Sequence, residues 1–159
     1  MMENKKVLVI LDYLRDSYIG HHRNGELFNR FDQSNDGKYI KGMTKLTAKE
    51  LGIDANIDVK TVFAYPLVPN LIKENKRNPE LNIYQPPTYQ TVKENLPDIQ
   101  KSINEYKPDA ILLAGTLSAK LLTGVGSISQ LRSRETPVSV EGVSYTALGT
   151  YSPGYVMSN

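Results

Sequence analysis

The chain has 159 residues, no cysteine, two histidines and a formal net charge of +2. Its length suits one domain with its own core, and its 40% apolar content is ordinary for a globular protein. The missing cysteines exclude disulfides, thiolate zinc sites and cysteine-ligated iron–sulfur clusters. No apolar run approaches the roughly 18 residues of a membrane span. We therefore expect a cytoplasmic protein without a membrane partner, a metal or another cofactor.

The first predicted element is a strand over residues 7–11, where five apolar residues follow one another. Continuous apolarity indicates that both faces are buried, as in a central parallel strand. Residues 12–37 are polar and contain several glycines, which predicts a long loop with one short helical turn near residues 26–28.

A helix is predicted over residues 38–51, and a second strand follows over residues 59–65. Leu46 and Leu51 are expected on the buried side of this helix, and Gly52 is expected to end it. Strand and helix signals thus alternate along the chain, which favours an α/β fold.

Residues 67–88 contain four prolines and predict a long connection with little regular structure. Loops of this length inside a compact domain are usually functional or mobile. Residues 91–106 carry apolar side chains at the spacing of an amphipathic helix, and Pro97 is expected to begin or kink a helix there.

Residues 110–114 and 143–148 predict two further strands, and residues 117–124 between them predict a helix. The whole chain, residues 1–159, is therefore expected to be a single α/β domain. It should have three layers, α/β/α, around a central, mainly parallel sheet of four strands. Ligands of such sheets bind outside the carboxyl ends of the strands.

The last third of the chain has a characteristic order of segments. The strand at residues 110–114 leads through Gly115-Thr116 into a helix, residues 127–134 follow, and the chain then reads Thr150-Tyr151-Ser152-Pro153-Gly154-Tyr155-Val156-Met157. This order resembles the uracil-DNA glycosylase superfamily, in particular its family 4 branch and the related domains fused to some phage DNA polymerases. The resemblance implies a uracil-DNA glycosylase-like fold and DNA as a partner. It also implies the N-terminal module of a longer phage polymerase, acting in the host cytoplasm.

The resemblance makes Asp12, Asp16 and Ser152 the candidates for catalysis. The family's water-activating motif follows the first strand, where this chain keeps only an acid, Asp12, with Asp16 as an alternative. Such a carboxylate could orient a water and stabilise an oxocarbenium-like sugar, or it could cap a helix. Ser152 stands where the family has a histidine that stabilises the leaving base, and a hydroxyl is a weaker donor.

Other parts of the family's mechanism are altered as well. The family's base-reading asparagine follows the second strand, whereas the first asparagine after that strand here is Asn70. The four cysteines that hold the iron–sulfur cluster of family 4 are missing. His21 and His22 could replace the lost histidine, although adjacent loop histidines are more often exposed to solvent. We therefore expect uracil excision to be weak or absent.

The segments that hold DNA in the family are better preserved. Residues 127–134 resemble the family 4 segment Ile-x-x-Leu-Arg-Gly, and residues 154–157 lie where the family's wedge loop enters the duplex. The expected DNA contacts are Ser127, Ser129, Gln130, Arg132, Arg134, Ser152, Pro153, Gly154 and Tyr155. A basic loop could also track a backbone or stack a base. It contains Lys73, Lys76 and Arg77 beside Tyr84 and Tyr89. We expect DNA binding that does not depend on sequence.

Three alternatives to this interpretation stay open. The chain could be an active uracil-DNA glycosylase, in which Asp12 or Asp16 orients water and Ser152 or a loop histidine supports the base. It could be a nucleotide- or small-molecule-binding domain whose Gly115-Thr116 turn holds the ligand. It could also be a protein-interaction module of a replication complex that carries a polymerase or a processivity partner.

Overall fold

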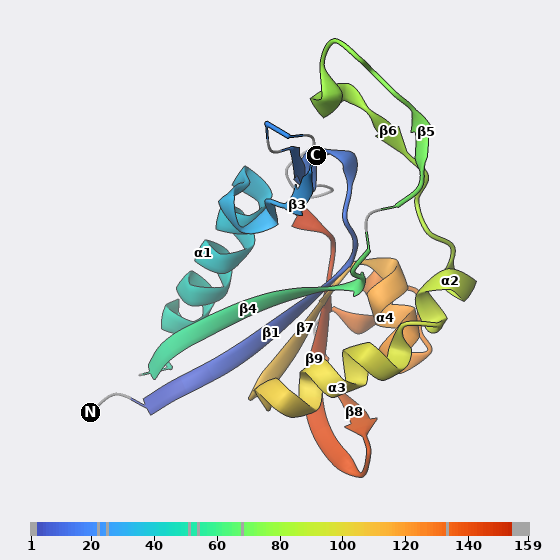
Figure 1. Ribbon diagram of the computed structural model, residues 1–159. Helices are drawn as coiled ribbons and strands as arrows, with labels where there is room; N and C mark the ends of the chain where they lie inside the picture. Colours follow the sequence, from blue (N-terminus) through green and yellow to red (C-terminus); the bar gives the residue numbers. More distant parts are fainter. Residues whose placement is uncertain are drawn as a thin grey trace.

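The computed structural model describes residues 3–21, 23–24, 26–50, 52–53, 55–67, 69–132 and 134–153. Its centre is a sheet in the order β4-β1-β7-β9-β8 (Figure 1). The five strands are β1 (Glu3–Tyr13), β4 (Ala55–Tyr65), β7 (Ala110–Ala114), β8 (Thr136–Val140) and β9 (Val143–Thr150). Neighbours pair in parallel except β8, which runs antiparallel to β9. The predicted α/β fold with a mainly parallel sheet is confirmed, and the sheet has one strand more than predicted.

Helices lie on both sides of this sheet, so the molecule has three layers. One side carries α2 (Tyr89–Lys93), α3 (Leu96–Tyr106), α4 (Thr116–Thr123) and α5 (Ile128–Leu131). The other side carries α1 (Asn35–Glu50), which Figure 1 shows across the sheet from α3 and α4. Pro97 lies in the first turn of α3, where its missing N–H group costs nothing, as the sequence predicts.

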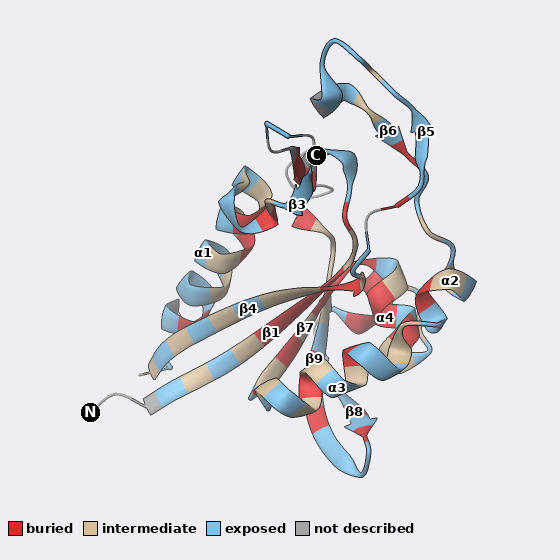
Figure 2. Ribbon diagram, viewed as in Figure 1, coloured by how far each residue is buried: buried red, intermediate tan, exposed pale blue. Residues whose placement is uncertain are grey.

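Two hydrophobic clusters form the core, one on each side of the sheet. Successive residues of a strand point to opposite faces, so Leu8 and Ile10 of β1 join the first cluster. Val9 and Leu11 join the second. Figure 2 shows the buried residues concentrated along the middle of β1 and on β7. These strands are central, which explains their continuous apolar sequence.

Aromatic packing orders the segment between β1 and α1, which the sequence predicts to be a loop. The Phe31 ring is fully buried and meets the rings of Tyr18 and Phe63 edge-on, with centroids 4.7 and 5.6 Å away. The Tyr18 hydroxyl donates a 2.6 Å hydrogen bond to the Asp36 carboxylate at the start of α1. The segment contains β2 (Ile19–His21), β3 (Leu27–Asn29) and the 3₁₀ turns η1 (Asp16–Tyr18) and η2 (Phe31–Gln33). The helical turn predicted near residues 26–28 is therefore wrong, because Leu27 and Phe28 belong to β3.

The predicted inner face of α1 is also wrong. Leu46 is 46% exposed, while Ile40 and Ala48 are buried against the sheet, and Leu51 lies outside the described residues. Ile40 and Ala48 are eight residues apart, about two helical turns, whereas Leu46 lies on another side of the helix. The large apolar side chain of Leu46 is thus exposed, while the small side chain of Ala48 packs against the sheet. Gly52, which the sequence predicts as the helix stop, takes a left-handed φ of 76°.

The missed strand β8 forms a hairpin with β9 at the edge of the sheet. It buries alternate residues, Val138 and Val140, and its turn residues Glu141 and Gly142 both have positive φ, as a tight two-residue hairpin requires. Pro137 within the strand argues against a strand in the sequence, but an edge strand tolerates a residue that cannot donate. A smaller hairpin also forms in the long connection between β4 and α2. It consists of β5 (Leu71–Lys73), the 3₁₀ turn η3 (Pro79–Leu81) and β6 (Ile83–Tyr84).

Replacing Phe31 by alanine should lower the free energy of unfolding by roughly 3–5 kcal/mol, because a fully buried ring is lost and a cavity is left. Urea denaturation followed by circular dichroism measures this change. Leu46→Ala is the control, since truncating an exposed side chain should change stability by about 0.5 kcal/mol or less. Equal effects of the two substitutions would contradict the assignment of Phe31 to the core.

Candidate functional site

The carboxyl ends of β1, β4, β7 and β9 meet at one edge of the sheet, where α/β proteins bind ligands. Asp12 near the end of β1 and Ser152 just after β9 line the same cavity there, with a volume of about 100 Å³. Its other lining residues are Leu11, Tyr13, Arg15, Tyr18 and Ala114. Two of the three catalytic candidates are therefore neighbours, although 140 positions separate them in the sequence.

Asp12 uses its carboxylate to cap a helix. Its Oδ1 accepts a 2.8 Å hydrogen bond from the backbone N–H of Ser118, in the first turn of α4. The residue directly before α4 is Gly115, and its φ of 149° is one that other residues rarely adopt. A β-carbon at Gly115 would collide with the Asp12 carboxylate. Glycine is thus required at this turn both for its backbone conformation and for the close approach of the acid.

Burial raises the pKa of Asp12 above its ordinary value. The N–H groups of Ser118, Leu117 and Thr116 act in the opposite direction, because they stabilise the charged form. Donors from α4 occupy lone pairs of this carboxylate, which leaves fewer of them to accept a hydrogen bond from a water molecule. The helix-cap interpretation of Asp12 thus describes its main contacts.

The same contact affects the proposal that the Gly115-Thr116 turn binds a nucleotide. A phosphate at such a turn would be held by the free N–H groups at the start of α4. Here the Asp12 carboxylate already occupies this position and accepts from Ser118. An incoming phosphate would have to displace a buried carboxylate of the same charge, so the turn is a poor anion site.

Asp16, the alternative acid, is not one of the residues that line this cavity. It is exposed, and its Oδ1 accepts a 3.2 Å hydrogen bond from the backbone N–H of Tyr84 in β6. The bond ties the loop after β1 to the small β5–β6 hairpin. The contacts of Asp16 are those of a structural residue.

The two segments expected to hold DNA come together beside the cavity. The guanidinium of Arg132, at the end of α5, lies 5.2 Å from the ring centroid of Tyr151, the residue before Ser152. Ser127 and Ser129 share a 2.9 Å hydrogen bond between their hydroxyls, while Gln130 and Arg134 are exposed and Pro153 is buried. Ser133, Gly154 and Tyr155 lie outside the described residues, as does His22.

A second aromatic ring at this edge is covered by lysines. Nζ of Lys120 in α4 lies 4.3 Å from the ring centroid of Tyr89, and Nζ of Lys93 lies 5.7 Å from it. Lys120 was not a sequence candidate, because nothing in the sequence indicates that α4 and α2 are neighbours. Tyr84, which the sequence pairs with Tyr89 as a stacking residue, is only 7% exposed and is wrong for that role.

Another small hollow lies on the β4 side of the same edge. Tyr65 pairs in register with Tyr13, and together with Asn70 and Gln85 it lines a hollow of about 140 Å³. The backbone N–H of Gln85 donates a 2.7 Å hydrogen bond to the carbonyl of Asn70, which closes the base of the β5–β6 hairpin. Asn70, the first asparagine after the second strand, therefore returns to the end of β4 across this connection.

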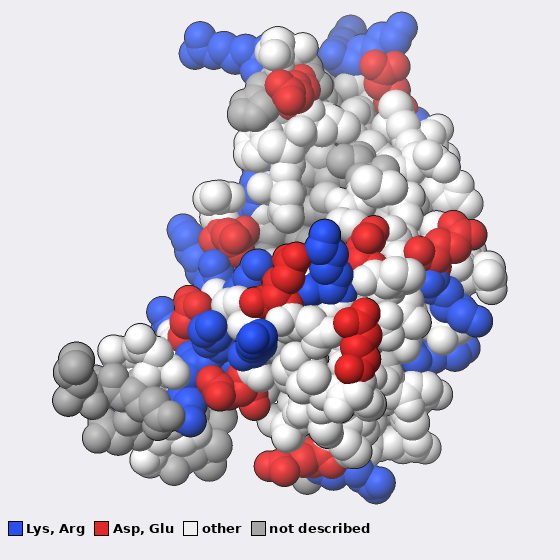
Figure 3. Space-filling model, turned by 60° about the horizontal axis from the view of Figure 1, so that its bottom comes forward, with Lys and Arg blue, Asp and Glu red and all other residues white. Residues whose placement is uncertain are grey.

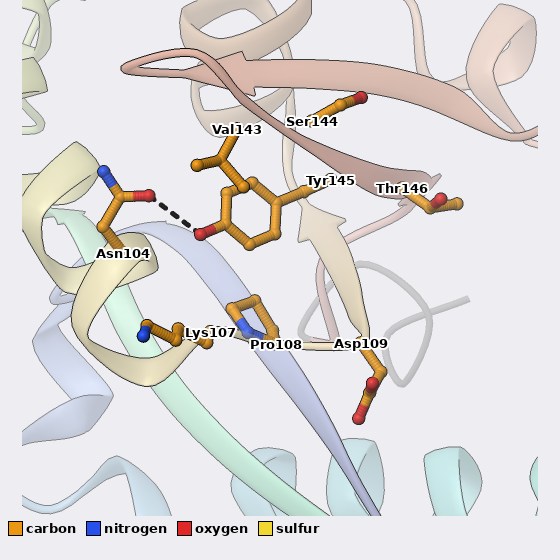
Figure 4. A pocket seen from close by; sticks show the side chains of 8 residues that line it. All are labelled: Asn104, Lys107, Pro108, Asp109, Val143, Ser144, Tyr145 and Thr146. Atoms are coloured by element: carbon orange, nitrogen blue, oxygen red, sulfur yellow. Dashed lines mark hydrogen bonds between the residues drawn. The ribbon is translucent and has the colours of Figure 1, made fainter.

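A wider hollow of about 680 Å³ lies at the opposite, amino edge of the sheet. Its polar groups bind one another: the Tyr145 hydroxyl donates to Oδ1 of Asn104 at 2.8 Å, as Figure 4 shows. The Asp109 carboxylate accepts a 2.8 Å hydrogen bond from the backbone N–H of Lys6. Basic and acidic side chains are interspersed on this side of the molecule (Figure 3). Among the described residues this face shows no extended patch of one sign, and the polar groups of the hollow already have partners, so the candidate site is placed at the carboxyl edge.

No family model matches the chain, and no curated protein matches it. Within the described part of the chain, no three histidine or acidic side chains gather where they could hold a metal ion. No helix in that part is long and apolar enough to cross a membrane. The function must therefore be argued from the carboxyl edge itself.

Replacing Asp12 by alanine should lower the free energy of unfolding by roughly 1–2 kcal/mol, because the N–H groups of α4 lose their acceptor. Asp12→Asn should cost less, since the amide oxygen can still accept from Ser118. Thermal and urea denaturation give both values. The control is Asp98→Ala in the first turn of α3, where an exposed acid contributes through the helix dipole, about 0.3–1 kcal/mol. An Asp12→Ala protein as stable as the wild type would show that the carboxylate does not cap α4.

Proposed function

We propose that this chain binds DNA along the carboxyl edge of its sheet and excises bases weakly or not at all. The observation that carries the proposal is the arrangement of cations over tyrosine rings at that edge, Arg132 over Tyr151 and Lys120 over Tyr89. The uracil-DNA glycosylase-like order of the last third supports it. That resemblance also makes a replication setting, as the N-terminal module of a phage polymerase, part of the proposal.

Cations over aromatic rings suit a nucleic-acid backbone for two reasons. Each charge lies over a neutral ring and, among the described residues, forms no ion pair with an acid, so it is available to phosphates. The rings themselves offer faces on which unpaired bases can stack. Neither contact reads a base edge, so binding should be largely independent of sequence.

The cavity that Asp12 and Ser152 share explains why excision should be weak. Its lining includes no imidazole and no amide among the residues that the structure describes. An amide is needed to pair with a base edge, and a strong donor is needed as charge develops on the leaving base. The remaining acid is engaged with α4. The missing imidazole should weaken leaving-group stabilisation, the missing amide should weaken base reading, and the engagement of Asp12 with α4 should weaken water activation.

An active glycosylase is the second candidate, and one observation favours it. Asp12 and Ser152 come from the two ends of the sequence and line one cavity, which is the arrangement that base excision would need. In this alternative Asp12 orients a water and the Ser152 hydroxyl donates to the base. An excision assay separates the two candidates.

Replacing both Arg132 and Arg134 by alanine should weaken DNA binding similarly for all sequences. Each phosphate contact removed should make the slope of log affinity against log salt shallower by roughly 0.7–0.9, because fewer counterions are released. Fluorescence anisotropy over a salt series measures affinity and slope together. The control is Lys45→Ala with Lys49→Ala, which removes the same charge from exposed positions of α1, the helix that lies across the sheet from α4 (Figure 1).

Two outcomes would contradict this prediction in different ways. If the control lowers affinity as much as the arginine pair, binding depends on net charge and not on the carboxyl edge. If the wild-type chain shows no DNA binding at low salt, the DNA proposal fails. A protein-interaction module of a replication complex would then be the better proposal.

Uracil excision by the wild-type chain should be at least about a hundredfold slower than that of an active family 4 enzyme, the usual cost of losing one transition-state donor. Release of uracil from a labelled oligonucleotide, followed by alkaline cleavage, measures the rate. A rate near that of the active enzyme would instead support the second candidate. Asp12→Asn and Ser152→Ala should then each lower it sharply.

A further inference from the structure

The hairpin between β4 and α2 exposes an unusual amount of apolar surface. This arm, residues 70–84, projects from the body of the molecule next to the carboxyl edge (Figure 1). Ile72 and Leu81 are 62% and 61% exposed, and Leu71 and Ile83 are also exposed. Exposed apolar side chains gathered on one segment usually mark a binding surface.

Internal hydrogen bonds hold the backbone of the arm in shape. The backbone N–H of Asn75 donates to Oδ1 of Asn82 at 2.7 Å, and that of Asn78 donates to Oδ1 of Asn75 at 2.9 Å. At the base, Tyr84 is buried in the second core cluster and its N–H is bound by Asp16. The exposed side chains are thus presented on an ordered ribbon, which lowers the entropy lost on binding.

Cations flank these apolar residues. Lys73, Lys76 and Arg77 are exposed at the turn of the arm, and none makes an ion pair or hydrogen bond with another side chain that the structure describes. Glu74 is the acid between them. Three unpaired positive charges around an apolar ribbon are complementary to a polyanion with apolar base stacks.

We propose that the arm enters a groove of duplex DNA, where its apolar side chains wedge against the base stack and its cations bind the flanking phosphates. The inference rests on the proposed DNA binding and extends it, since it assigns duplex DNA to this segment. Two-stranded β-ribbons fit DNA grooves, and apolar wedges beside cations are a common means of unstacking bases. The arm begins beside Tyr65 and Asn70, so DNA on the carboxyl edge would lie within its reach.

The experiment compares the wild-type chain with three variants on a duplex that contains 2-aminopurine and on the matching single strand. The wedge variant is Ile72→Ser with Leu81→Ser, and the charge variant is Lys73→Gln with Lys76→Gln and Arg77→Gln. The control is Met43→Ser with Leu46→Ser, which removes two exposed apolar side chains from α1. All substituted side chains are exposed, and circular dichroism confirms that each variant is folded.

The wild-type chain should raise the 2-aminopurine fluorescence of the duplex as the base stack opens. The wedge variant should lose this signal and bind the duplex several-fold more weakly, with its affinity for the single strand unchanged. The charge variant should bind both DNAs more weakly and with a shallower salt slope, by roughly 0.9 for each duplex phosphate released. The control should behave as the wild type.

The inference is overturned if the wild-type chain binds the duplex without a fluorescence change, or if the wedge variant keeps both signal and affinity. In that case DNA binding at the carboxyl edge still stands, and the apolar arm serves a protein partner instead. Failure of the wild-type chain to bind any DNA at low salt would overturn both the inference and the proposed function.

Discussion

The contact between the Asp12 carboxylate and the start of α4 positions most of the carboxyl edge. It joins the end of β1 to the helix that follows β7, and it requires both the backbone conformation and the missing side chain of Gly115. Since the carboxylate is largely withdrawn from water, its hydrogen bonds to the helix N–H groups are stronger than they would be at the surface. The placement of α4 in turn brings Lys120 over Tyr89.

This use of Asp12 has a consequence for chemistry. An acid that activates water needs a free lone pair aimed at the water, whereas an acid that caps a helix is held by donors and aimed at the backbone. Asp12 lines the cavity with Ser152, but its hydrogen bond is the one expected of a structural helix cap.

The sequence predicts elements well where burial on both faces or a clear cap determines them. The central strands β1 and β7 and the glycine stops of α1 and α4 follow from local patterns. The edge strand β8 does not, because only alternate residues are buried and Pro137 argues against a strand. The prediction that Leu46 is buried is wrong, because it rests on the hydrophobicity of leucine. The helix period instead turns Ala48 towards the sheet.

Part of the candidate site is predictable from the sequence, because it depends on where the predicted strands end. Asp12 lies near the carboxyl end of β1 and Ser152 follows that of β9, so the geometry of parallel sheets brings them together whatever the details of the loops. Lys120 and Tyr89 depend on how α4 packs beside α2, and Tyr84 depends on how the arm folds back on the body. Such contacts join segments with no shared local pattern, so a single sequence does not reveal them.

The distribution of charge matters for the proposed DNA binding, because the net charge of the chain is only +2. The ion pairs among the described residues, Lys41–Asp32 and Lys101–Glu105, leave the cations over Tyr89 and Tyr151 unneutralised. Long-range attraction by the whole molecule is weak at this net charge, so the proposed binding would depend on short-range contacts at the carboxyl edge and the arm. These cations lie beside aromatic and apolar side chains, so each proposed phosphate contact would be accompanied by a surface for bases.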